Sequence, residues 1–156
     1  MTEEKDRMDG LRAEIDEVGR AALRRVDLGV RATVVAGAVT VLLLAMSLPW
    51  TGSISGWEVL RGTAGPAYQI GLLPRLFGAV ALAFGVGLST LALLTRRWGL
   101  VWASALGCGY CVLDGIWAIW SRQTAHSVGP GIGLILAVLC LVMLAAQWCK
   151  LAVSRR

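Results

Sequence analysis

Residues 128–148 read VGPGIGLILAVLCLVMLAAQW and contain no charged side chain. A helix of about 20 residues crosses the ~30 Å hydrocarbon core of a lipid bilayer. Three further apolar runs precede this one, at 32–49, 76–94 and 98–120, and the four runs are 18, 19, 23 and 21 residues long in chain order. The sequence therefore predicts an all-α polytopic membrane protein, with a bundle of four transmembrane helices over residues 29–156.

Composition and charge favour the same class. The chain of 156 residues is 56% apolar and 16% charged, whereas soluble domains have about 25% charged residues. Residues 1–31 hold eight of the ten acids, and the other two are Glu58 and Asp114. Basic residues near the ends of apolar runs are typical of membrane boundaries. No basic stripe with interleaved aromatics is present, so we predict membrane lipids and no nucleic acid among the partners.

The distribution of Lys and Arg predicts an orientation. Seven precede the first run, two lie in the 95–97 turn and three follow the last run, so twelve of 15 lie on one side. The positive-inside rule places both termini and this turn in the cytoplasm, for a multi-pass protein of the plasma (inner) membrane. About 28 mostly polar residues come first, so we expect no cleavable signal peptide and a first span that is retained.

Tryptophans lie close to the predicted span ends. An indole ring prefers the membrane interface because its body is apolar and its N–H needs a partner. We therefore predict five interfacial anchors: Trp50, Trp57, Trp98, Trp120 and Trp148.

Residues 1–28 are predicted to form a cytoplasmic segment whose part 3–27 is an amphipathic helix. Its apolar residues follow spacings of three and four and are candidates for a partner interface: Met8, Leu11, Ile15, Val18 and Ala22. The helix could lie on the membrane, dock on a partner's cytoplasmic domain, or remain a solvated tail. The acidic first half favours a protein partner for residues 3–18, because anionic lipid would repel it.

The outer loop, residues 50–75, is the one sizeable segment predicted outside the spans on its side. Residues 55–60 could form a short helix capped by Ser55. The loop could cover the outer end of the bundle or contact an outer partner. It has a single acid, Glu58, and no His, Cys or Asp, so a catalytic role is not expected here. For the chain as a whole we predict no catalytic, cofactor-binding or metal-binding residues and no cofactor.

Small residues recur every four positions in the second run. Ala79, Ala83 and Gly87 form one stripe, and an adjoining stripe has Ala81, Gly85 and Ser89. Small residues at this spacing let helices approach closely in lipid. Because a bundle needs about one stripe per helix, the first stripe is a candidate interface with another protein.

Asp114 is the single acid within a predicted span. Such a residue is a candidate functional site, because a carboxylate is costly in lipid. It could act in a proton or substrate relay, be neutral or hydrogen-bonded for structural reasons, or pair with a group on a partner subunit. His126, in the short turn 121–127, could reach it only if the turn bends inward.

Cys108 and Cys111 form a C-x-x-C motif inside the third run. In a soluble thioredoxin-like context this motif would be redox-active. Four-helix membrane thiol oxidoreductases also carry it, but they need a second outer thiol pair that is missing here. Cys140 and Cys149 lie in or at the end of the fourth run. Packing as small apolar residues is the simpler interpretation, and no nearby His completes a zinc site.

The chain resembles small four-span membrane proteins of actinobacteria in its basic leader, its Ala/Gly/Val/Leu-rich spans and the segments Leu48–Trp50 and Gly56–Leu60. Some such proteins resemble accessory subunits of mycobacterial lipid importers of the Mce type. The resemblance implies a role in stabilising a permease partner. We therefore predict a non-enzymatic accessory subunit of an inner-membrane lipid or solute transporter. The alternatives are a self-assembling transporter or channel that uses Asp114, and a membrane thiol oxidoreductase that uses Cys108 and Cys111.

Overall fold

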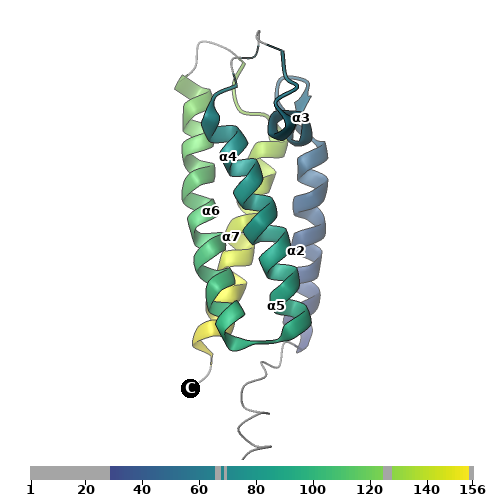
Figure 1. Ribbon diagram of the computed structural model, residues 1–156, viewed down its shortest axis with the longest axis vertical. Coiled ribbons are helices and arrows are strands. Elements are labelled where there is room, and N and C mark those ends of the chain that lie inside the picture. The colour runs from purple at the N-terminus through teal and green to yellow at the C-terminus, as the bar shows by residue number, and fades with distance from the viewer. Residues whose placement is uncertain (1–28, 66–67, 69, 125–127, 155–156) are drawn as a thin grey trace, which may run out of the picture.

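The structure is a computed structural model that describes residues 29–65, 68, 70–124 and 128–154. The described part is a mostly helical, all-α bundle (Figure 1). The predicted N-terminal helix and His126 lie outside the described residues. Four long, antiparallel helical segments stand side by side. Their order around the bundle is α2 (Gly29–Ser47), α7 (Ile132–Val153), α6 (Trp98–Thr124) and the segment 72–95, which closes the ring on α2.

The segment 72–95 changes helix type along its length. It begins as α4 (Leu72–Val80), continues as the π-helical η2 (Ala81–Leu88) and ends as α5 (Ser89–Thr95). The Ser89 hydroxyl donates a hydrogen bond to the Phe84 carbonyl at 3.2 Å, five residues back. π-Helical turns are rare, and they occur mostly as single-turn bulges inside α-helices, frequently at functional sites. Here the π-helical turns lie beside α6, whose side chains donate to the carbonyls of this segment.

All four helical segments are long and apolar enough to cross a membrane. They are Val30–Ser47, Leu72–Thr95, Trp98–Thr124 and Ile132–Val153, with mean hydropathies of 1.9, 2.1, 1.4 and 2.4. The sequence located each of them, although the ends differ by several residues. The last helix, for example, starts at Ile132 and not at 128, because Pro130 pairs with Thr51 and the Gly131 N–H donates to the Trp50 carbonyl.

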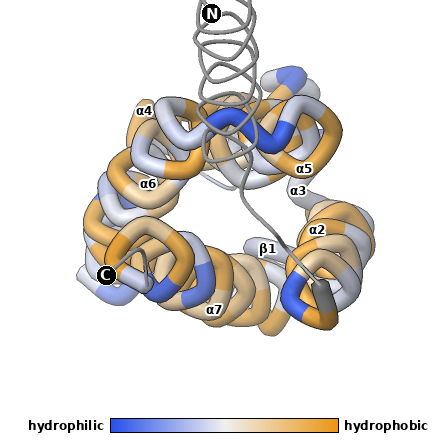
Figure 2. The backbone as a smooth tube through the Cα atoms, turned by 90° about the horizontal axis from the view of Figure 1, so that it is seen from below, coloured by the Kyte–Doolittle hydropathy of each residue, from blue (hydrophilic) through white to orange (hydrophobic). Residues whose placement is uncertain are grey.

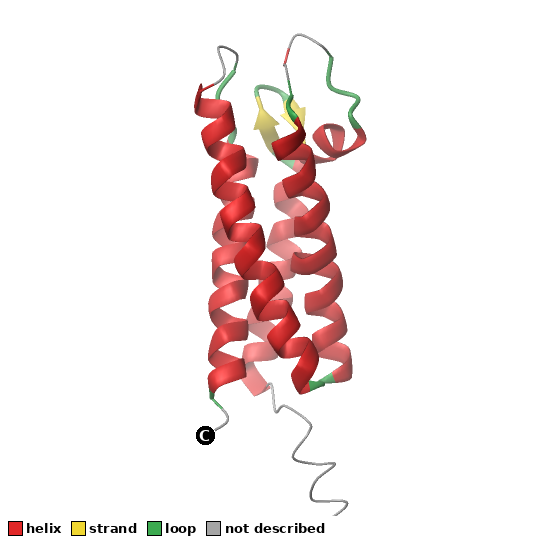
Figure 3. Ribbon diagram, turned by 60° about the vertical axis from the view of Figure 1, so that its left-hand side comes forward, coloured by secondary structure: helices red, strands yellow, loops and turns green. Residues whose placement is uncertain are grey.

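A small cap covers the end of the bundle at which α2 finishes (Figure 3). Strands β1 (Pro49–Thr51) and β2 (Ile54–Ser55) pair antiparallel and lead into the short helix α3 (Gly56–Arg61). The sequence did not predict this hairpin, whose strands are only three and two residues long. The short helix capped by Ser55 is confirmed. The Ser55 N–H donates a hydrogen bond to the Glu58 carboxylate at 2.8 Å, which completes a capping box.

Large aromatic and aliphatic side chains fill the interior. Trp50 is fully buried beneath the cap, lies 5.4 Å from Phe77 between ring centroids, and donates its indole N–H to the Ala45 carbonyl at 2.9 Å. Trp148 is fully buried towards the opposite end of the bundle and donates to the Ser89 hydroxyl at 3.0 Å. Two indoles thus satisfy their single donor inside the bundle, where an unpaired N–H would be costly.

Candidate functional site

The two small-residue stripes of the segment 72–95 face opposite ways. Ala81, Gly85 and Ser89 are buried, whereas Ala79, Ala83 and Gly87 are exposed. A Cβ added at Gly85 would lie 2.7 Å from Leu42 and 2.9 Å from Leu141, so this glycine lets three helices meet closely. The three residues of the exposed stripe face away from the interior of the bundle. Its role as a protein interface stays a prediction.

The predicted tryptophan anchors divide into two groups. Trp98 and Trp120 are exposed on α6, at 44% and 64%, and Trp57 is partly exposed on α3. Trp50 and Trp148 lie in the core instead of at a surface. Sequence position alone could not separate the groups, because a tryptophan near a span end can turn inward when a backbone carbonyl or hydroxyl can accept its N–H.

Asp114 is 2% exposed on the inner side of α6. Among the described residues, its Oδ2 atom has no hydrogen-bond partner. Cys111 and Ala118, one turn away on either side, are also fully buried. An unsatisfied buried polar atom costs about 1–3 kcal/mol, so this carboxyl group is energetically unfavourable in the core. These contacts do not test whether Asp114 is neutral or hydrogen-bonded for structural reasons, or pairs with a group on a partner subunit.

The two cysteines of the C-x-x-C motif bind the neighbouring helix instead of each other. The Cys111 thiol donates to the Val80 carbonyl at 3.3 Å, and the Cys108 thiol lies 3.9 Å from the Phe84 carbonyl and 3.8 Å from the Ser89 hydroxyl. Ser104 continues the row with a bond to the Leu88 carbonyl at 3.4 Å. All four cysteines are free thiols. The row joins α6 to the π-helical segment.

Arg122 is a structural residue that sequence reasoning treated only as a basic residue on the outer side. It is 2% exposed, and its guanidinium donates to the carbonyls of Val128 at 2.7 Å and Tyr68 at 3.2 Å. It therefore ties two loops to the top of α6. The signal in the sequence was its spacing, because Arg122 follows Asp114 and Ala118 at four-residue intervals on the buried face.

No group of three or more His, Cys, Asp or Glu side chains within the described ranges could hold a metal ion. The described chain thus presents a helical bundle with an apolar surface, a cap at one end and a hydrogen-bonded polar row inside. By its fold, the described part of the chain is a four-helix bundle domain. The chain belongs to the MiaB C-terminal domain family, which it matches over residues 12–156.

A named relative is the tRNA-2-methylthio-N(6)-dimethylallyladenosine synthase of Mycobacterium avium (strain 104). It is 46% identical over 153 residues, which are 96% of this chain and 21% of the relative. The chain therefore spans about a fifth of the length of this relative. No solved structure matches the chain.

These findings correct the functional predictions. The resemblance to an accessory subunit of an Mce-type importer is wrong, because the family is the MiaB C-terminal domain. The transporter subunit, the channel that uses Asp114 and the thiol oxidoreductase that uses Cys108 and Cys111 fail with it. The prediction of a non-enzymatic protein is also corrected, since the relative is named as a synthase.

The predicted partners and location are corrected on the same grounds. The relative's name is that of an enzyme of tRNA modification, which contradicts the exclusion of nucleic acid and the expectation of a permease partner. The family likewise gives no support to a multi-pass component of an inner-membrane transport machine with both termini in the cytoplasm. The sequence contained no motif for tRNA chemistry, and the transport class was inferred from the apolar composition together with the resemblance to the importer subunits.

Proposed function

We propose that this chain is a domain of an enzyme that makes 2-methylthio-N(6)-dimethylallyladenosine in tRNA, and that its four helices hold the enzyme in a lipid bilayer. The observation that carries the first part is the 46% identity to the mycobacterial synthase over 96% of the chain. The remaining four fifths of that relative lie outside the match. The reacting groups of such an enzyme would accordingly be sought there first.

The outer surface of the bundle supports the second part. Between 28% and 44% of the most apolar window of each helix is buried inside the bundle, so most of these apolar residues face outward. Large exposed side chains occur on every helix, among them Leu44, Leu94, Leu106 and Leu139 at 58% or more. Monomeric soluble proteins rarely expose apolar patches beyond a few hundred Å². In a bilayer, lipid acyl chains would cover this apolar surface, so it would not be exposed to water.

The position of the charges fits a bilayer as well. At one end of the bundle lie Arg31, Arg96, Arg97 and Lys150, and near the other lie Arg61, Arg75 and Arg122. Viewed from the first end, the tube is hydrophobic over much of its perimeter (Figure 2). The shortest of the four long helical segments, α2, has 19 residues and is about 28 Å long, close to the ~30 Å hydrocarbon thickness.

The end with the four exposed basic residues is also the end at which α2 begins (Figure 1). A synthase portion that precedes the bundle would then lie on this side. Lys and Arg attract the phosphates of a nucleic acid irrespective of its sequence. The bundle would thus keep the modifying enzyme near the membrane surface with its basic end towards the tRNA.

The experiment compares cells whose synthase carries this domain with cells in which the coding sequence of the domain alone is deleted. The fraction of the methylthio-modified adenosine in tRNA is measured by mass spectrometry, and the synthase is followed in membrane and soluble fractions. We expect deletion to lower the modified fraction and to move the synthase out of the membrane pellet. Unchanged modification would overturn the role in tRNA modification. A chain that stays soluble would overturn the bilayer, and its apolar faces would then have to be covered by protein.

A further inference from the structure

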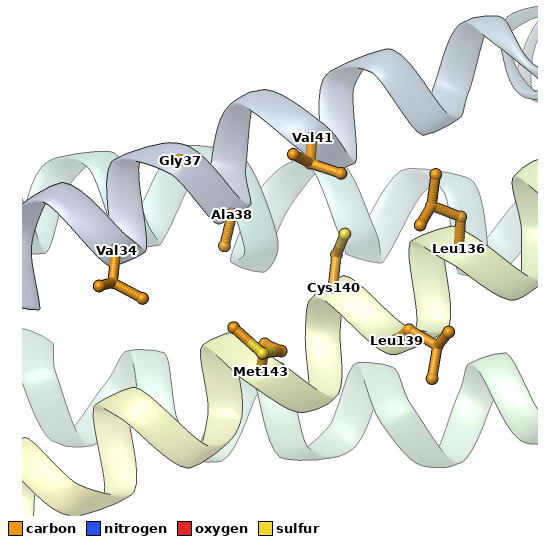
Figure 4. Close-up of a pocket in the computed structure, with 8 residues that line it drawn as sticks. All are labelled: Val34, Gly37, Ala38, Val41, Leu136, Leu139, Cys140 and Met143. Atoms are coloured by element: carbon orange, nitrogen blue, oxygen red, sulfur yellow. The ribbon is translucent and has the colours of Figure 1, made fainter.

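A groove runs between α2 and α7 on the outside of the bundle. It has a volume of about 310 Å³ and an apolar lining made of four residues from each helix: Val34, Gly37, Ala38, Val41, Leu136, Leu139, Cys140 and Met143. Figure 4 shows Ala38 of α2 and Cys140 of α7 pointing into the space between the helices. No charged side chain lines the groove, so a hydrocarbon chain is a suitable occupant.

The same helix pair carries a second, basic hollow. It has a volume of about 450 Å³ and is lined by Arg31, Cys149, Lys150, Val153 and Ser154. Arg31 belongs to the first turn of α2, and Lys150 to the last turn of α7. Both side chains are exposed. An anion between them would meet two positive charges at the end of the bundle.

Helical spacing places the two hollows on one continuous face. Arg31, Val34, Ala38 and Val41 follow each other at intervals of three, four and three residues on α2. On α7, Lys150 lies seven residues, or two turns, after Met143. The apolar groove therefore leads into the basic hollow.

The length of this face matches one leaflet of a bilayer. Ten residues separate Arg31 from Val41, which is a rise of about 15 Å along the helix. This is half of the ~30 Å hydrocarbon thickness. A lipid chain that starts at the basic end would thus fill the groove as far as the middle of the membrane.

We propose that the α2–α7 face binds a phospholipid with an anionic headgroup, one acyl chain lying in the groove and the phosphate between Arg31 and Lys150. This inference rests on the bilayer part of the proposed function. It adds a specific lipid site to a surface that would otherwise contact lipids without preference. Binding of the bundle to a membrane would then depend on the content of anionic lipid.

The test uses native mass spectrometry of the full chain released from bilayer nanodiscs. The discs hold equal amounts of phosphatidylglycerol and phosphatidylcholine with identical acyl chains. We expect one retained phosphatidylglycerol per chain, with a preference of about tenfold over phosphatidylcholine. Inorganic phosphate at millimolar concentration should not displace it, because a free anion lacks the acyl chain.

Two pairs of variants separate the parts of the site. Arg31→Gln with Lys150→Gln should abolish the headgroup preference, whereas Arg96→Gln with Arg97→Gln, at the same end of the bundle, should leave it unchanged. Ala38→Leu should fill the groove and lower lipid retention about tenfold. Ala36→Leu, an exposed alanine of the same helix that does not line the groove, is its control.

Equal retention of both lipids, an equal loss of preference in the Arg31/Lys150 and Arg96/Arg97 variants, or a second copy of the chain in place of the lipid would overturn the site. Each of these outcomes leaves the bilayer part of the proposed function intact. A chain that fails to enter nanodiscs would instead overturn that part, and the lipid site with it.

Discussion

The segment 72–95 carries two stripes of small residues that share composition and four-residue spacing but have opposite surroundings. The buried stripe is Ala81, Gly85 and Ser89, and the exposed stripe is Ala79, Ala83 and Gly87. An offset of two residues rotates a position by roughly 200° around a helix, so the stripes lie on opposite faces. A small residue brings two helices close together only where the side chains of a neighbouring helix pack against it.

The buried stripe meets large partners. Leu42 and Leu141 approach Gly85, and Trp148 donates to Ser89. Around the exposed Gly87, an added Cβ would contact only the Leu82 carbonyl, at an ordinary 3.5 Å. The two stripes therefore give matched positions at which the same substitution should have very different effects.

The largest expected effect is that of Gly85→Leu. Its side chain would overlap the fully buried Leu42 and Leu141, and overpacking of this kind costs typically 1–3 kcal/mol and occasionally more. Unfolding of the purified chain in detergent, followed by circular dichroism against added denaturant, would measure the loss. Gly87→Leu is the matched control and should be neutral or slightly stabilising, because leucine favours helix over glycine by several tenths of a kcal/mol. Equal stability of the two variants would remove the distinction between the stripes.

The next effect is that of Ser89→Ala, which removes a hydroxyl of the buried stripe. The Trp148 N–H would lose its acceptor inside the core, and such a loss costs about 1–3 kcal/mol. Thr90→Ala, at the exposed neighbouring position, should change the free energy of unfolding by less than about 0.5 kcal/mol. The same denaturant titration compares them. A neutral Ser89→Ala would show that the indole finds another acceptor.

The contrast between buried and exposed positions extends to the thiols. Cys108 contacts the buried stripe through Ser89, whereas Cys149 is exposed. N-Ethylmaleimide should alkylate Cys149 at least about tenfold faster than Cys108 in the folded protein, because reaction requires access to the thiolate. Peptide mass spectrometry over time gives both rates. Denatured protein is the control, since all four cysteines should then react alike; similar rates in the folded state would contradict the packing described.

The smallest effect is expected at the cap, where a polar contact is open to solvent. Hydrogen bonds from the Ser55 backbone N–H and hydroxyl lower the pKa of Glu58. A lowered pKa in the folded state stabilises α3 above the pKa of an unfolded glutamate, and this contribution is lost as the pH falls through the folded pKa. The protection of the α3 amides against hydrogen exchange, taken relative to the intrinsic exchange rate at each pH, should therefore fall on acidification below about pH 4. In Glu58→Gln this pH dependence should vanish, and a persistent dependence would assign it to another group.

Much of the fold could be predicted from the sequence. Long apolar runs predict helices because the buried or lipid-facing surface of each helix is contained in one contiguous stretch of sequence. Ser55 and Glu58 predict the short helix because the two residues of a capping box are only three positions apart. The hairpin was missed because its strands are too short for an alternating pattern. Trp50 and Trp148 were placed at an interface because burial depends on acceptors supplied by other helices.

The candidate site was harder to predict. Small-residue spacing located both stripes, but which of them faces inward follows from the positions of Leu42, Leu141 and Trp148 in space. The α2–α7 face joins residues more than 100 positions apart, so no local pattern contains it. The family itself came from similarity to another chain, since apolar composition is shared by many unrelated helical proteins.

By itself, the sequence determined four apolar helices, their limits within a few residues, and the position of Arg31, Arg96, Arg97 and Lys150 near helix ends. These properties follow from the hydropathy and periodicity of contiguous residues. Only the tertiary structure decided which faces are inside, that Arg122 ties two loops, and that Arg31 and Lys150 line the same hollow. Such properties depend on how the helices are rotated and paired, and that is set by side-chain shapes and hydrogen-bond partners far apart in the chain.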